Sequence, residues 1–170
     1  MIKIKFTNGK PALEFLEAET IKEAVELAAA KKISLSGADL RGADLSGGYM
    51  SRVDLSGADL LDSDLSYTCL FRADLRETDL FRADLHYTNL RGADLRGADL
   101  DYGSWPLWCG SLTAKIDKKI FCQLLYHVVR AGQSVDDEEV RKFLDLPEVI
   151  RLANQFHRAK ECGEIKGAGK

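Results

Sequence analysis

A leucine recurs every five residues between Ile33 and Tyr102, and this spacing dominates the pattern of apolar and polar positions. Met50 takes the leucine position once, so fourteen units follow one another without an insertion. A small or β-branched residue usually stands two places before the leucine, and aspartate usually stands one place before it. A period of five matches neither a helix nor a flat strand. The pattern therefore predicts a chain that turns a corner every five residues and buries the leucines in a stacked solenoid.

The repeating units resemble the pentapeptide-repeat family, as in Gly42-Ala43-Asp44-Leu45, Arg82-Ala83-Asp84-Leu85 and Gly97-Ala98-Asp99-Leu100. The resemblance covers 70 of the 170 residues. It implies a mainly β fold, a right-handed quadrilateral β-helix with four repeats, or 20 residues, in each coil, and with the leucine and the residue two before it pointing inward. At a strand spacing of about 4.8 Å, the repeats predict a rod about 17 Å long.

Residues 1–32 are expected to cap the solenoid. Apolar residues alternate with lysines in residues 2–6, and Asn8-Gly9 is a strong hairpin signal. Thr20 and Glu23 then form a capping box at the start of a helix. The segment predicts an N-terminal β-hairpin followed by a helix.

Residues 103–170 predict a C-terminal helical unit after the repeats at 33–102. Trp105 and Trp108 are expected to cover the open coil end. Helices are predicted to begin after Asp117, after a capping box of Ser134 and Asp137, and at Pro147. The apolar face expected for the first of these helices comprises Ile120, Phe121, Leu124, Leu125, Val128 and Val129. The sequence leaves open whether this unit is a lid, a second binding surface or a homodimer contact.

The overall composition is typical of a soluble globular protein, with 45% hydrophobic residues, 30% charged residues and a net charge of −3. The absence of an apolar run of 18 residues and of a signal pattern argues against a membrane protein and predicts a cytoplasmic location. Four cysteines in that setting are interpreted as reduced thiols.

Sorting the repeats by a 20-residue period places the aspartates in columns on three of the four faces of the coil. The first face carries Asp39, Asp59, Asp79 and Asp99, the second Asp44, Asp64 and Asp84, and the fourth Asp54, Asp74 and Asp94. The third face carries Tyr49, Cys69 and Asn89 in their place. Residues 33–102 contain twelve Asp and one Glu against seven Arg, a net charge of −6.

Two roles are open for these aspartates. An aspartate before a turn accepts hydrogen bonds from backbone N–H groups. Regularly spaced carboxylates on a rigid rod can also imitate the phosphates of DNA, and this is the predicted function. The predicted phosphate mimics comprise Asp39, Asp59, Asp79, Asp99, Asp44, Asp64, Asp84, Asp62 and Asp101.

The expected partner is a DNA-binding protein, since a solenoid of this charge is repelled by nucleic acid itself. The resemblance implies two kinds of target, because the family contains proteins that protect DNA gyrase and phage proteins that block RNA-guided CRISPR nucleases. A rod about 17 Å long matches only about five base pairs. This length favours the protospacer-adjacent-motif site of a CRISPR nuclease, an anti-CRISPR role, over the long DNA segment held by a topoisomerase.

A plain protein-interaction scaffold is the alternative. Its contacts would come from aromatic and arginine side chains on the third face and its corners, which comprise Tyr67, Tyr87, Phe71, Arg52 and Arg72.

Catalysis and cofactor binding find no support in the sequence, which carries no nucleophile elbow, phosphate-binding loop or metalloprotease motif. Cys122 and His127 are five residues apart, as are His157 and Cys162. That spacing is a poor match to zinc sites. The expectation is a protein without enzymatic activity, metal or cofactor.

Overall fold

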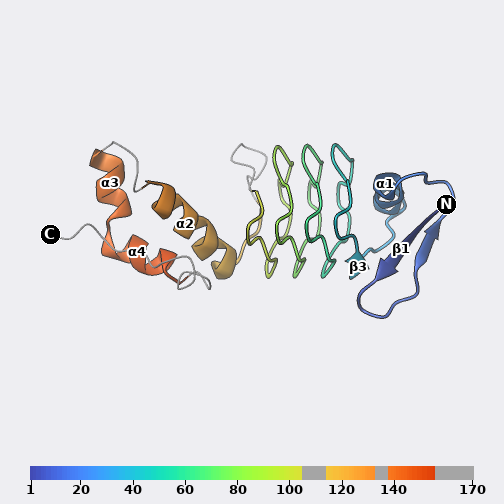
Figure 1. Cartoon of the computed structure of the whole chain (residues 1–170), viewed down its shortest axis with the longest axis horizontal. Helices are drawn as coiled ribbons and strands as arrows, with labels where there is room; N and C mark the ends of the chain where they lie inside the picture. The colour runs from blue at the N-terminus through green and yellow to red at the C-terminus, as the bar shows by residue number, and fades with distance from the viewer. Residues whose placement is uncertain (105–113, 133–137, 156–170) are drawn as a thin grey trace. The chain divides into compact units, whose positions relative to one another are not determined.

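The computed structural model of the 170-residue chain describes residues 1–104, 114–132 and 138–155 (Figure 1). These residues divide into two compact units, Met1–Ile116 and Asp117–Lys170. The predicted boundary at residue 32 does not separate units, because the N-terminal segment belongs to the same unit as the repeats. The predicted boundary at residue 102 lies inside the first unit as well.

The N-terminal segment folds as a hairpin and a helix. Strand β1 (Ile2–Phe6) pairs antiparallel with β2 (Leu13–Phe15), and helix α1 spans Ile21–Lys31. The Thr20 hydroxyl accepts a hydrogen bond from the Glu23 N–H at 3.1 Å, as the capping box predicts. The Glu23 carboxylate accepts from the Glu19 N–H at 2.7 Å instead of from the Thr20 N–H.

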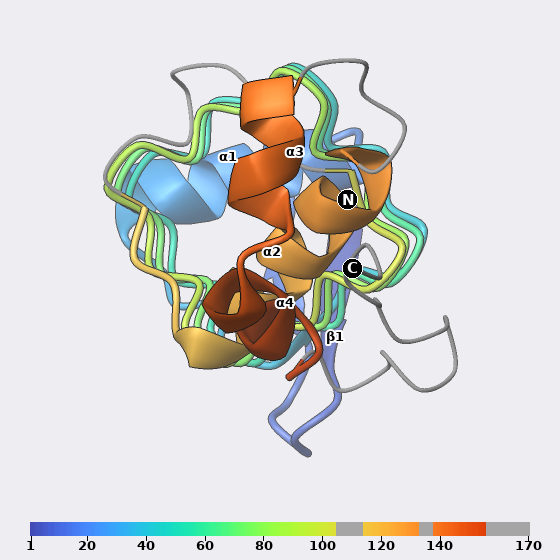
Figure 2. The same ribbon diagram turned by 90° about the vertical axis from the view of Figure 1, so that its left-hand side faces the viewer.

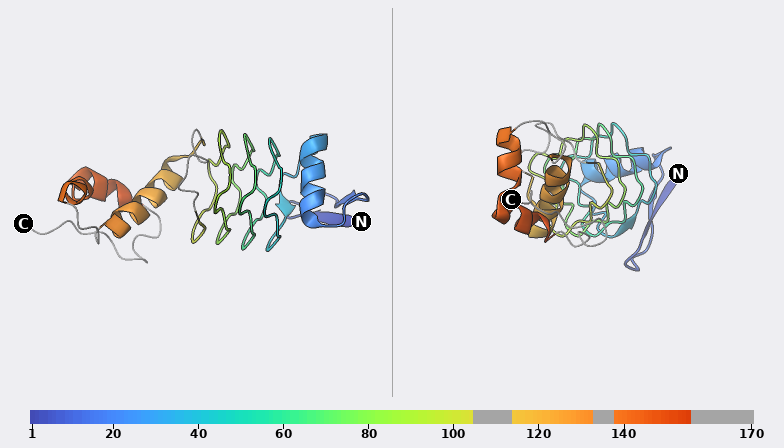
Figure 3. Two further views of the ribbon diagram at one scale, coloured as in Figure 1. Left: turned by 90° about the horizontal axis from the view of Figure 1, so that it is seen from above. Right: turned by 60° about the vertical axis from the view of Figure 1, so that its left-hand side comes forward.

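The hairpin is joined to the solenoid through β3 (Ala38–Asp39). Strand β1 pairs antiparallel with β3, which gives the sheet order β2-β1-β3. Helix α1 lies beside the first coil (Figure 3) and buries Ala24, Val25 and Ala28. The hairpin therefore continues one face of the first coil, and helix and hairpin together cover apolar surface at that end.

The repeats form coils of 20 residues, as the resemblance implies. Bridges between residues 20 positions apart, such as Asp59 with Asp79, join neighbouring coils on each of the four faces. Figure 1 shows these coils side by side, and in Figure 2, viewed along the stack, they superimpose. Leu65, Leu75 and Met50 are fully buried. The inward position of the leucines is therefore confirmed, and residues two before them, such as Ala73, are buried as well.

One further bridge extends the fourth face beyond the repeats. Lys115 pairs with Asp94, and its N–H donates to the Ala93 carbonyl at 2.7 Å. Trp105 and Trp108, the expected cover of the coil end, lie outside the described residues.

The second unit contains the helices α2 (Lys118–Gly132), α3 (Glu138–Leu144) and α4 (Pro147–Ala153). Its core contains Tyr126, Val129, Leu144 and Ala153. The three predicted helices are present, and the Asp117 carboxylate caps α2 by accepting from the Ile120 N–H at 3.0 Å. The predicted capping box of Ser134 and Asp137 lies outside the described residues.

The apolar face predicted for α2 is wrong at two positions. Phe121 and Val128 are 45% and 55% exposed, whereas Cys122 and Tyr126 are buried. The predicted face did not include Tyr126, although the ring of this tyrosine packs in the core of the unit. Among the helices that the structure describes, none is long and apolar enough to cross a membrane.

Candidate functional site

The aspartates before the leucines have the turn role that their position predicts. Each described carboxylate accepts a hydrogen bond from the backbone N–H two residues later, as Asp79 does from Phe81 at 2.9 Å and Asp64 from Ser66 at 2.8 Å. Asn89 occupies the same position on the third face and accepts from the Arg91 N–H at 3.2 Å. An uncharged amide oxygen therefore satisfies the turn, and the turn alone does not require the negative charge.

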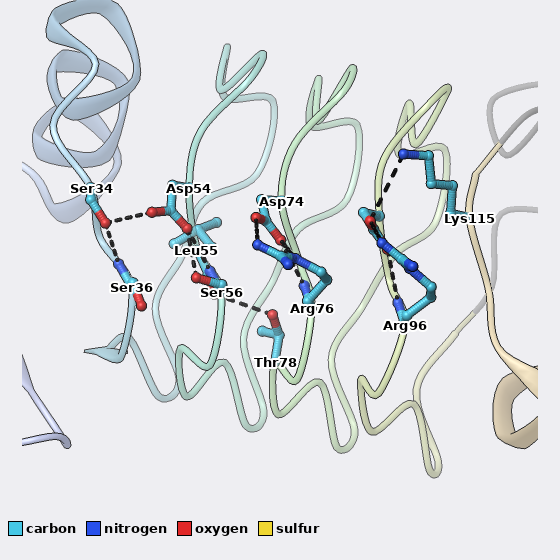
Figure 4. Close-up of polar contacts among 11 residues, drawn as sticks. Ser34, Ser36, Asp54, Leu55, Ser56, Asp74, Arg76, Thr78, Arg96 and Lys115 are labelled. Atoms are coloured by element: carbon cyan, nitrogen blue, oxygen red, sulfur yellow. Dashed lines mark hydrogen bonds and ion pairs between the residues drawn. The ribbon is translucent and has the colours of Figure 1, made fainter.

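Arginines placed directly after a leucine pair with the aspartate two residues earlier. The Arg41 guanidinium donates to Asp39 at 2.8 and 2.9 Å, and Arg96 contacts Asp94 in the same two-bond arrangement. Figure 4 shows this contact on the fourth face, together with the neighbouring Arg76 pair. The hydrogen bond from Arg96 holds the pKa of Asp94 below its ordinary value, although partial burial opposes the shift.

On the fourth face, arginine therefore compensates two of the three aspartates. Asp74 and Asp94 each have their own arginine, and Asp54 accepts hydrogen bonds from the Ser34 and Ser56 hydroxyls at 2.5 and 2.7 Å. The aspartates of this face were not among the predicted phosphate mimics, and their compensation agrees with that choice.

On the first and second faces, a smaller share of the aspartates pairs with arginine than on the fourth face. Arg41 lies 3.5 Å from Asp59 in addition to its contact with Asp39, and Arg82 contacts Asp62 at 3.1 Å. Asp84 pairs with His86 and Ser104. Among the described residues, no ion pair involves the carboxylates of Asp44, Asp64, Asp79 and Asp99.

The charge of the solenoid is segregated when each face is counted with the corner that follows it. The first and second faces, here called the acidic faces, carry nine aspartates against Arg41 and Arg82, a net charge of −7. The third and fourth faces carry three aspartates and Glu77 against five arginines, a net charge of +1. The whole negative charge of residues 33–102 therefore lies on one side of the coil.

One predicted member of the acidic set is not on the surface. Asp101 is only 3% exposed, so its carboxylate does not extend the acidic faces as predicted. Its place in the coil explains the difference, because Phe81 and Leu61, one and two coils earlier, are also partly covered. Without Asp101 the acidic faces present eight aspartates and a net charge of −6.

A second cluster, here called the tyrosine–arginine face, lies on the third face and at the corners on either side of it. It comprises Tyr49, Tyr67, Tyr87, Phe71, Arg52, Arg72 and Arg91. The rings of Tyr67 and Tyr87 stack with centroids 5.0 Å apart and remain 66% and 59% exposed. The Arg72 guanidinium lies 5.0 Å from the centroid of the Phe71 ring. Tyr49, 80% exposed, and Arg91 were not among the predicted contacts, although the 20-residue period places both beside them.

The arginines of this face have no carboxylate partner within the described part of the chain. Arg91 follows Asn89 where Arg96 follows Asp94, so the charge that would pair with it is missing. Arg72 lies in a column with Arg52 and Gly92, whereas Arg82, at the equivalent corner, lies above Asp62. The sequence of each column therefore explains which arginines are paired.

No metal site is formed by the described residues, among which no group of three His, Cys, Asp or Glu side chains converges. Cys122 is buried, and Cys69 has its sulfur 3.3 Å from the Ser51 hydroxyl. The His127 side chain, His157 and Cys162 lie outside what the structure describes.

Comparison with known proteins assigns the repeats. A family model described as pentapeptide repeats matches residues 33–70 and 70–101 in eight copies. No curated protein matches the chain. Among solved structures, a pentapeptide repeat protein from Nostoc Pcc 7120 is 28% identical over 58% of this chain and 96% of its own, with a TM-score of 0.44.

Two further solved structures are similar to this chain. A pentapeptide repeat protein from the Arabidopsis thaliana thylakoid lumen is 24% identical over 66% of this chain and 70% of its own, with a TM-score of 0.37. QnrB1, a plasmid-mediated fluoroquinolone resistance protein, is 17% identical over 53% of this chain and 65% of its own, with a TM-score of 0.28.

Proposed function

Because the chain belongs to the pentapeptide-repeat family, whose repeats form right-handed quadrilateral β-helices, we propose that it is a non-catalytic inhibitor whose acidic faces mimic DNA. The partner under this proposal is a DNA-binding protein, and the acidic faces occupy the cleft in which that protein holds duplex DNA. The observation that carries the proposal is the segregation of charge, −7 on the acidic faces against +1 on the other two.

The linear charge density supports this reading. Three steps between neighbouring coils span about 14 Å at the usual strand spacing. The exposed acidic faces carry a net charge of −6 over that length. Duplex DNA carries one charge per about 1.7 Å, or about eight charges over the same length. The two densities are similar, so a basic cleft that attracts DNA also attracts this side of the coil.

Asn89 strengthens the inference that the charge serves a partner. It satisfies the turn without a charge, yet the first face uses aspartate at four successive coils. Two carboxylates 4.8 Å apart repel by about 0.9 kcal/mol in water. A column of aspartates therefore opposes folding in a way that a column of asparagines would not, and binding to a basic partner relieves that repulsion.

The length of the acidic faces favours a short DNA-binding cleft. An RNA-guided nuclease that reads a few base pairs next to its target is the proposed target, which would make the protein an anti-CRISPR inhibitor acting in the cytoplasm. DNA gyrase is the second candidate, although its longer DNA segment matches the short acidic faces less well.

Competition for DNA tests the proposal. Purified protein is titrated into a guide-loaded CRISPR nuclease and, separately, into gyrase, and binding of a labelled duplex is followed at about 50 and 300 mM salt. We expect loss of DNA binding by one target, and we expect the loss to weaken at the higher salt concentration.

Two variants identify the face responsible. Replacing Asp59, Asp79 and Asp99 by Asn keeps the turn acceptors and removes three charges, so inhibition should weaken at least about tenfold. The matched variant Tyr67→Ala/Tyr87→Ala alters the third face and should inhibit normally. If neither enzyme loses DNA, or if the tyrosine variant alone is inactive, DNA mimicry is rejected in favour of an interaction scaffold.

A further inference from the structure

A cleft of about 680 Å³ lies at the N-terminal end of the tyrosine–arginine face. Ala29 in the last turn of helix α1 and Ile33, just after the helix, form one wall, and the corner of the solenoid forms the other, with Phe71. Its volume is in the range of known ligand sites, and its walls are largely apolar. It belongs entirely to the first compact unit and is separate from the acidic faces.

The charged groups that line the cleft are predominantly cationic. Lys32 and Arg52 are exposed, and among the described residues neither forms an ion pair. Asp54 is the one acidic residue of the lining, and its carboxylate already accepts hydrogen bonds from Ser34 and Ser56. The cleft therefore offers two available cations beside an apolar surface.

The positive charge continues along the solenoid beyond the cleft. Arg72 lies one coil further from Arg52, and Arg91 begins the corner of the next coil. At a coil spacing of about 4.8 Å, the arginines extend over about 10 Å. A small molecule held in the cleft does not reach that far, whereas a peptide chain spans the distance with three or four residues.

We propose that this cleft and the arginines that continue it bind an acidic peptide segment of a partner protein. A bulky apolar side chain of the segment occupies the space between α1 and Phe71, and neighbouring carboxylates pair with Arg52, Arg72 and Arg91. Nucleic acid is a poor occupant, because the net charge of −7 on the adjacent acidic faces repels phosphates and three arginines neutralise few of them.

Display selection tests the partner chemistry without a known ligand. A random library of 12-residue peptides is panned in parallel against three full-length proteins, namely the wild type, Arg52→Ser/Arg72→Ser and Arg82→Ser. Arg82 is the matched control, since it has the same left-handed corner backbone, with φ of +59° against +61° and +56°, but pairs with Asp62 on the acidic faces. Circular dichroism verifies that each variant is folded.

We expect peptides with Asp or Glu around Leu, Phe or Trp to be enriched on the wild type and on Arg82→Ser. Recovery on Arg52→Ser/Arg72→Ser should fall at least about fivefold. Enrichment of neutral or basic peptides, no enrichment at all, or equal recovery on all three proteins would overturn the proposal.

A selected peptide then tests the cleft itself. Its affinity, measured by fluorescence anisotropy, should fall at least about fivefold with Ala29→Trp, which fills the cleft from the helix side. Unchanged affinity would place the peptide elsewhere and reject this site. Light scattering of the wild type without peptide tests whether a second copy of the protein occupies the cleft. Self-association that disappears in Arg52→Ser/Arg72→Ser would make the acidic faces of another molecule the occupant.

Discussion

The substitution Asp79→Asn separates the two roles of an aspartate in this solenoid. Asp79 accepts from the Phe81 N–H at 2.9 Å, and its bridges place it between Asp59 and Asp99 on the first face. Asparagine keeps the acceptor oxygen and removes the charge, whereas alanine removes both. The pair of variants therefore measures the turn and the charge separately.

The expected magnitudes follow from these contacts. Each neighbouring carboxylate repels Asp79 by about 0.9 kcal/mol in water, roughly halved at 0.15 M salt, so asparagine relieves about 1 kcal/mol. The hydrogen bond from Phe81 weakens by a similar amount when its acceptor becomes neutral. Asp79→Asn should therefore change the free energy of unfolding by less than about 1 kcal/mol. Asp79→Ala is neutral like Asp79→Asn but lacks the acceptor oxygen, so it should be about 1 kcal/mol less stable than Asp79→Asn.

Urea unfolding followed by circular dichroism checks this, at low salt and at 0.5 M NaCl. Asn89→Ala is the neutral control, because it removes a turn acceptor without changing the charge, and it should lose about 1 kcal/mol at both salt concentrations. Salt should stabilise the wild type more than Asp79→Asn. If Asp79→Asn is as unstable as Asp79→Ala, the turn needs the carboxylate itself, and the acidic column is no longer evidence for a partner.

Four other predictions concern the core, the buried hydroxyls, the paired aspartates and the third face. Leu65→Ala should lower the free energy of unfolding by about 2 to 5 kcal/mol in urea titrations, since Leu65 is fully buried. Thr88→Val should lose about 1 kcal/mol in the same assay, because the Thr88 hydroxyl donates to the Leu65 carbonyl at 2.7 Å. The lowered pKa of Asp94 contributes stability that is fully present when the pH is above the pKa of the unfolded state, and this stability is lost as the pH falls through the pKa of the folded state. Arg96→Gln should reduce this acid-dependent loss in melting curves measured between about pH 5 and 2. Asn89→Asp should pair with Arg91 as Asp94 pairs with Arg96, and should reduce peptide recovery in the selection described above.

Much of the first unit is predictable because its signals are local. The five-residue period specifies which side chains point inward, and Asn8-Gly9 specifies the hairpin. The pairing of β1 with β3 could not be predicted, since it joins residues 5 and 39 through backbone hydrogen bonds that leave no sequence pattern. The helices of the second unit were predictable from caps and proline, but the burial of Tyr126 depends on neighbours from other helices.

The residues that line each face of the candidate site were predictable from the sequence, but the difference in net charge between the faces was not. The 20-residue period places Tyr67 over Tyr87 and aligns the aspartate columns, as the structure shows. Counting charges over the whole repeat segment hid the contrast between faces. The burial of Asp101 is a property of the last coil, whose surroundings a repeat pattern does not describe.

The two surfaces have a common origin in one position of the repeat. An aspartate before the leucine satisfies the turn, and where an arginine comes two residues later the aspartate also pairs with it, as in Asp39 with Arg41. On the third face Asn89 replaces that aspartate, so Arg91 has no carboxylate to pair with, and Arg52 and Arg72 lie in a column without an aspartate. On the acidic faces most aspartates are not followed by arginine, so the carboxylates keep theirs. Because the coil fixes every side of the solenoid in one rigid frame, these choices give a single short domain two surfaces of opposite charge.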